Sequence, residues 1–96
     1  MSDAARRYPG DARRAFVAEA RATDGERELD EADDVDLANR GAAYCARLAE
    51  TGSSLKAVFA LQLAGETHPG DVYVTAAARR HLCPDLPDTE SSPGRG

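Results

Sequence analysis

Two cysteines and two histidines are the residues of this 96-residue chain whose types could do chemistry. Cys45 and Cys83 lie 38 positions apart, and His68 and His81 precede the second of them. A thiol beside an imidazole is the usual arrangement of a cysteine nucleophile, and cysteines with histidines also bind zinc. The four residues therefore raise three questions, namely catalysis, metal binding and covalent cross-linking.

The spacing of the histidines argues against the first two. His81 and Cys83 are two positions apart, which on a helix places them on nearly opposite sides. The chain contains no CxxC or HxxxH pattern that would bring further ligands together. We expect His81 to cap carbonyl groups or face solvent and His68 to cap a helix. The sequence thus predicts no catalytic, cofactor-binding or metal-binding residue and no cofactor.

The two cysteines allow three interpretations. A disulfide between Cys45 and Cys83 would close the loop between them and stabilise the fold by about 4 kcal/mol in the chain-entropy model. Two reduced thiols could instead pack as small hydrophobic side chains in an intracellular protein, and a metal site is the third possibility. A disulfide is favoured because the core is thin, with nineteen alanines against two Phe, three Tyr and no Trp.

The charge of the chain excludes one class of partner. The net charge is -5, whereas nucleic-acid binding needs a basic surface. Eight acids and one arginine fall between Asp24 and Asp36, so we expect an acidic, solvated connector over residues 23–33. No apolar run approaches the roughly 20 residues of a membrane-spanning helix, and no secretory signal is visible at the start of the chain.

The apolar periodicity predicts four helices. The first follows Asp11 as N-cap and runs to about Ala22, where Gly25 ends it; Phe16 lies on its apolar side. The second starts near Asp33 or Asp34 and ends at Gly52. Its two predicted buried stripes are Val35, Ala38, Ala42, Cys45 and Ala49, and Leu37, Gly41, Tyr44 and Leu48.

The second half of the chain predicts two more helices. Ser53 caps a third helix over residues 54–64, which Gly65 ends; its apolar set is Leu55, Val58, Phe59, Leu61 and Leu63. Thr67 or His68 caps a fourth helix over residues 70–82. Its apolar rows are Val74, Ala78 and Leu82, and Val72 and Ala76.

These elements define one all-α domain. We expect a flexible N-terminus over residues 1–10, a single helical domain over residues 11–84 and a disordered tail over residues 85–96. Helices two to four form a three-helix bundle to which the first helix is added, and the Cys45–Cys83 disulfide staples it. The fold class is therefore a small four-helix domain.

Segments around both cysteines resemble a known family. The run Gly41 to Cys45, followed by Leu48 and Gly52, resembles its pattern G-x-x-x-C-x-x-L-x-x-x-G. The segment from Val74 to Pro84 resembles its closing pattern F-V-x-A-A…Y-C-P, with Leu82 in place of the aromatic, and Phe16-Val17 resembles its opening F-L. The family is domain of unknown function 732, a group of small exported actinobacterial proteins.

The resemblance implies a compartment and a linkage but no reaction. Members are typically secreted or lipid-anchored helical domains whose two cysteines pair, which would make Cys45 and Cys83 the bonded pair. The sequence therefore suggests a non-enzymatic exported or cell-envelope protein that acts as an interaction module, with the acidic connector and first helix as contact surface. The alternative is an intracellular helical adaptor or regulator with reduced cysteines. The sequence specifies neither a protein partner nor an oligomeric state.

Overall fold

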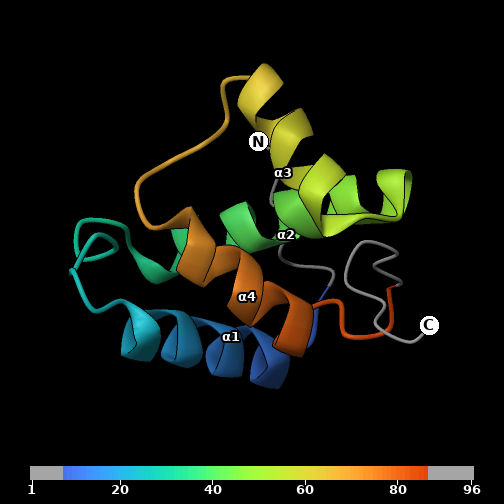
Figure 1. Cartoon of the computed structure of the whole chain (residues 1–96). Coiled ribbons are helices and arrows are strands. Elements are labelled where there is room, and N and C mark those ends of the chain that lie inside the picture. Colours follow the sequence, from blue (N-terminus) through green and yellow to red (C-terminus); the bar gives the residue numbers. More distant parts are fainter. Residues whose placement is uncertain (1–7, 87–96) are drawn as a thin grey trace, which may run out of the picture.

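The computed structural model describes residues 8–86, which form four helices and no strand (Figure 1). The helices are α1 (Gly10–Thr23), α2 (Asp34–Thr51), α3 (Ser54–Leu63) and α4 (Asp71–His81). The predicted all-α, four-helix fold is confirmed. Residues 1–7 and 87–96, which hold most of the predicted flexible ends, lie outside the described residues, and Tyr8 and Leu86 pack against the core.

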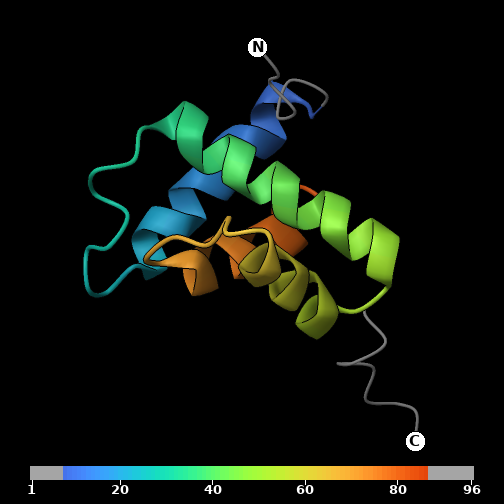
Figure 2. The ribbon, with the colours of Figure 1, turned by 90° about the horizontal axis from the view of Figure 1, so that it is seen from above.

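Helix α2 is the centre of the fold, because it contacts each of the other three helices. The side chain of Asp33 accepts a hydrogen bond from the backbone of Asp36 at 2.8 Å, and Gly52 ends the helix with φ of 71°. Both caps match the predicted ones. Figure 2 shows α2 crossing α1.

The buried face of α2 is narrower than predicted. The whole stripe of Leu37, Gly41, Tyr44 and Leu48 is buried. In the neighbouring stripe only the middle three residues are buried, whereas Val35 and Ala49 are exposed, so their predicted burial is wrong. These two positions lie in the first and last turns of α2, beyond the part of the helix that its neighbours cover.

Helix α1 packs mainly along α4 and buries Phe16 and Ala20. Its predicted caps are wrong by one or two residues. The N-cap is Pro9 without a side-chain hydrogen bond, which leaves Asp11 in the first turn, and the helix ends at Thr23 before Gly25. Proline suits the start of a helix because its φ is already close to the helical value.

Helix α1, helix α2 and the end of α4 meet at Gly41. A Cβ atom on this residue would lie 2.7 Å from Cζ of Phe16 and 2.9 Å from Cδ1 of Leu82. Both side chains are buried, so neither can move away at low cost. Glycine is therefore required at this position by space.

The caps of α3 are as predicted, but those of α4 are not. Ser53 accepts a hydrogen bond from the backbone of Lys56 at 3.2 Å, and Gly65 follows α3 with φ of 72°. The N-cap of α4 is Gly70, without a side-chain hydrogen bond, so the predicted capping by Thr67 or His68 is wrong. Asp71 provides the local bond instead by accepting from the backbone of His68 at 2.8 Å.

One of the two predicted apolar rows of α4 faces the core. Val74, Ala78 and Leu82 are buried, as predicted, whereas Val72 and Ala76 are exposed. Ala77 takes their expected place in the core. Helix α4 packs against both α1 and α2, so it buries a wider surface than one row. Ala77 extends this buried surface beside the row of Val74, Ala78 and Leu82.

The acidic connector between α1 and α2 is anchored at three points. Leu29 is fully buried, and its Cδ2 lies 2.6 Å from where a Cβ on Gly70 would be. The buried carboxylate of Asp24 accepts hydrogen bonds from the backbones of Glu28 and Leu29 at 2.9 and 2.8 Å. Arg21 donates to the carbonyls of Leu29 and Ala32.

The crossing at Gly41 gives a stability prediction. Replacing Gly41 by alanine should lower the free energy of unfolding by about 1–2 kcal/mol, since overpacking outweighs the gain in helix propensity. Gly25→Ala is the matched control, because a Cβ atom on Gly25 would have no neighbour within 4 Å and the φ of this residue is negative. Urea denaturation should find the control within about 0.5 kcal/mol of wild type; equal stability of both variants contradicts the proposed crossing.

Candidate functional site

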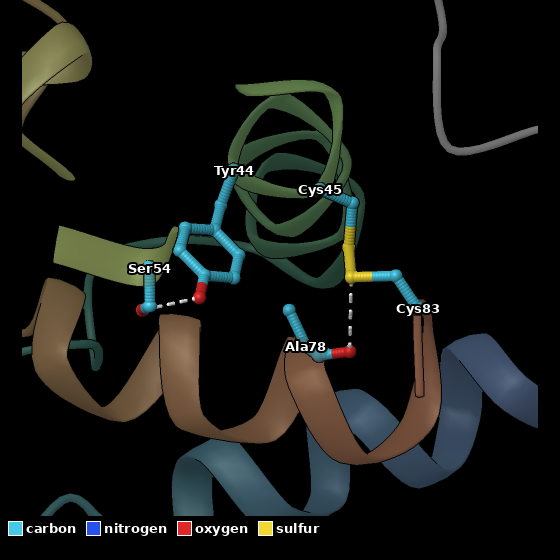
Figure 3. The surroundings of a disulfide bond; sticks show 5 residues. All are labelled: Tyr44, Cys45, Ser54, Ala78 and Cys83. Atoms are coloured by element: carbon cyan, nitrogen blue, oxygen red, sulfur yellow. Dashed lines mark hydrogen bonds between the residues drawn. A yellow bond between two sulfur atoms is a disulfide. The ribbon is translucent and has the colours of Figure 1, made fainter. Parts of the chain in front are cut away.

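Cys45 and Cys83 form a disulfide that joins the middle of α2 to the residue after Leu82, the C-cap of α4 (Figure 3). The sulfur atoms are 2.05 Å apart and the Cα atoms 6.0 Å apart. The bond is nearly shielded from solvent, because both residues are buried. The Sγ atom of Cys83 lies 3.6 Å from the carbonyl oxygen of Ala78, and the backbone of Cys83 donates to the same oxygen.

Tyr44 precedes Cys45 on α2, and the two side chains leave the helix in different directions (Figure 3). Its ring is fully buried, and its hydroxyl is 2.6 Å from Oγ of Ser54 at the start of α3. A buried tyrosine needs such a partner for its hydroxyl. Two consecutive residues of α2 therefore fix the two ends of the 54–83 segment, one covalently and one by a hydrogen bond.

The histidines take different positions from those predicted. His81 is half-buried, and its Nε2 lies 2.7 Å from Oε1 of Glu19 on α1, so it neither caps carbonyls nor faces solvent. Arg80 approaches the same carboxylate at 3.3 Å. The hydrogen bond from His81 lowers the pKa of Glu19, and the charge of Arg80 acts in the same direction, while partial burial opposes both.

The cysteines and histidines of the described residues do not form a thiol–imidazole pair. Cys45 and Cys83 are oxidised, His81 is held by Glu19, and His68 is exposed in the turn before α4. Within residues 8–86, no group of three or more His, Cys, Asp or Glu side chains is placed to hold a metal ion. The arrangement of these residues suits a structural role.

The most unusual surface of the molecule is the outer side of α3. Leu55, Phe59 and Leu63 follow one another at four-residue spacing and are 67%, 58% and 74% exposed. Helix α3 rests on α2 and has Ala57 and Leu61 as its buried residues. Three large apolar side chains in a row on one helix face form a contiguous apolar patch, which we call the α3 stripe.

The α3 stripe is the feature that the sequence analysis missed. Leu55, Phe59 and Leu63 were predicted to share one apolar set with Leu61, although residues 55 and 61 lie on different sides of a helix. The sequence does indicate an exposed apolar surface here. This ten-residue helix has apolar residues on all its sides, and a single neighbouring helix can bury only some of them. The expected contact surface on the connector and first helix contains no comparable apolar row within residues 8–33.

Comparisons with protein-family models, curated proteins and solved structures found no match to this chain. The resemblance of the two cysteine-containing segments to domain of unknown function 732 therefore stays a prediction. Among the described helices, none combines the length and apolar character required to cross a bilayer.

The disulfide gives the second stability prediction. Replacing both Cys45 and Cys83 by alanine should lower the free energy of unfolding by about 4 kcal/mol, because the unfolded chain regains the freedom of a 38-residue loop. Urea denaturation measures the loss. Wild-type protein treated with reductant is the control and should lose a similar amount, whereas an unchanged midpoint on reduction contradicts a stabilising bond.

The Glu19–His81 contact predicts a pH dependence. Because the pKa of Glu19 is lowered in the folded state, its stabilising effect is present above the pKa of the unfolded chain and is lost as the pH falls through the folded value. Glu19→Gln should therefore reduce the melting temperature at about pH 7, and the difference from wild type should shrink as the pH falls below the usual pKa of a glutamate. The exposed connector residue Glu26 supplies the control variant, Glu26→Gln. A difference that persists at low pH contradicts the prediction.

Proposed function

We propose that this protein is a non-enzymatic, exported or cell-envelope interaction module that binds a protein partner through the α3 stripe. The observation that carries the proposal is the exposure of Leu55, Phe59 and Leu63 on the outer side of one helix. Exposed apolar patches of this kind mark contact sites, since each exposed side chain gains free energy when a partner covers it. A helix that presents anchors at four-residue spacing suits an apolar groove on the partner.

The position of α3 supports this role. The start of α3 is fixed to α2 by the contact of Ser54 with Tyr44, and the ion pair of Glu66 with Arg47 at 3.6 Å links the turn after α3 to the same helix. The stripe is thus presented on a preformed helix, and binding does not require that segment to become ordered first. Helix α3 lies at the far end of the molecule from α1 (Figure 1).

The disulfide supports the proposed compartment. Disulfides persist in oxidising environments such as the cell exterior and are uncommon in the cytosol. A small domain with an alanine-rich core is also the kind of protein that gains most from such a bond. The intracellular adaptor is the competing proposal, and the two differ in the redox state of Cys45 and Cys83 in protein isolated from its source under alkylating conditions.

Site-specific photo-crosslinking tests the contact surface. A benzophenone side chain placed at position 59 should form an adduct with a protein in an envelope fraction of the source cells, and the same group at the exposed position 76 on α4 should not. Unlabelled wild-type protein should compete with the adduct. The variant Phe59→Ser/Leu63→Ser should compete at least about ten-fold less well, since two apolar anchors are lost.

Two results would overturn the proposal. One is an adduct that forms equally from positions 59 and 76, and the other is a serine variant that competes as well as wild type. Val72→Ser is the matched control, because Val72 is an exposed apolar residue outside α3 and its loss should leave competition unchanged. Circular dichroism of each variant confirms the fold, which exposed substitutions should preserve.

A further inference from the structure

We infer that a groove between α1 and the start of α2 is a binding site for a free medium-chain carboxylate. The groove has a volume of about 460 Å³ and is separate from the α3 stripe. This volume lies within the range of small-molecule sites. Its lining combines apolar and basic side chains, which include Val17, Val35, Ala38, Arg13, Arg14 and Arg21.

The basic groups are not equivalent. Arg21 is bound to Asp34 at 2.9 Å and to two connector carbonyls, and Arg14 is paired with the exposed Asp11. No acid of the described residues pairs with Arg13, and its buried Nε has no hydrogen-bond partner there. A buried N–H group without a partner is uncommon and costly. Arg13 is therefore the arginine of the groove whose charge no acid of the described residues neutralises, and its terminal Nη2, near the groove residue Gly10, is the group that a bound anion would meet.

The position of these groups sets the orientation of the ligand. Arg13 and Arg14 belong to the first turns of α1, where the helix dipole also favours negative charge. The apolar floor continues over Val17 and Ala38 towards Val35, which is exposed on α2. The carboxylate would bind at Arg13, and its alkyl chain would cover Val17 and Val35.

Charge complementarity selects an anion over other amphiphiles. The protein carries a net charge of -5, yet this groove contains three arginines and one acid, Asp34, which is already bound to Arg21. A cation with the same alkyl chain would meet the arginines at close range and be repelled. A short carboxylate without a chain would leave the apolar floor uncovered and lose the larger part of the binding energy.

Titration of the intact protein with sodium decanoate, below its micelle concentration, tests this site by methyl and arginine NMR. Saturable shifts are expected for the Val17 and Val35 methyl groups and the Arg13 Nε–H, and not for the Leu55 and Leu63 methyl groups. Decyltrimethylammonium and acetate are the matched probes, of which the first has the tail without the negative charge and the second the charge without the tail. Both should bind at least about ten-fold more weakly than decanoate.

Variants separate the head and tail contacts. Arg13→Gln should weaken decanoate binding about ten-fold, and Val35→Ser, at an exposed position that the fold does not need, should also weaken it. Lys56→Gln on α3 is the charge-matched control and should bind as wild type does. The inference is overturned if decanoate gives no saturable shift, if either groove variant binds like wild type, if decyltrimethylammonium binds as tightly, or if the shifts appear on α3.

Discussion

The contact on which the fold depends is the close approach of three helices at Gly41. Phe16 from α1 and Leu82 from the end of α4 both pack where a side chain on Gly41 would stand. One turn further along α2, Cys45 bonds to Cys83, the residue after Leu82. Leu82 is thus held by steric fit and the next residue, Cys83, by a covalent bond. Each of these two contacts keeps the other in register. The buried core contains two aromatic side chains, Phe16 and Tyr44, and the first of them packs at this junction, which therefore concentrates much of the core's specificity.

The connector shows how an acidic segment becomes part of a fold without a helix or strand of its own. Its net charge is high, but a single buried leucine and two polar residues of opposite charge, Arg21 and Asp24, hold its backbone. Asp24 acts as a local cap for two amide groups, and Arg21 donates to carbonyls on the other side. Gly70 completes the arrangement, because only a residue without a side chain leaves room for Leu29. The connector thereby ties the start of α4 to the end of α1.

Local rules predicted the parts of this fold that depend on local interactions. The caps Asp33, Ser53 and Gly52 involve neighbouring residues, and each can be recognised from its own segment. The central stripe of α2 was also clear, since its residues are large or spaced regularly. Two kinds of prediction failed. The N-caps of α1 and α4 are Pro9 and Gly70, which make no side-chain capping bond that a sequence pattern would show. The buried residues of α3 and α4 were also wrong in part, because only the neighbouring helices decide which row is buried. Glu19 and His81 are far apart in sequence, and the groove at Arg13 is lined by residues of two different helices. No pattern within a single segment predicts such contacts.

The covalent link has a topological consequence for assembly. Residues 45–83 form a closed ring that includes α3 and α4, and the ring is anchored within one chain. Two copies cannot exchange α4 to make a domain-swapped dimer while both rings stay closed, because the exchanged helix would have to leave its own sulfur partner. Exchange of the ring segment is therefore blocked as long as the bond is intact, whereas α1 lies outside the ring, and reduction of a single bond would remove the restriction on α4.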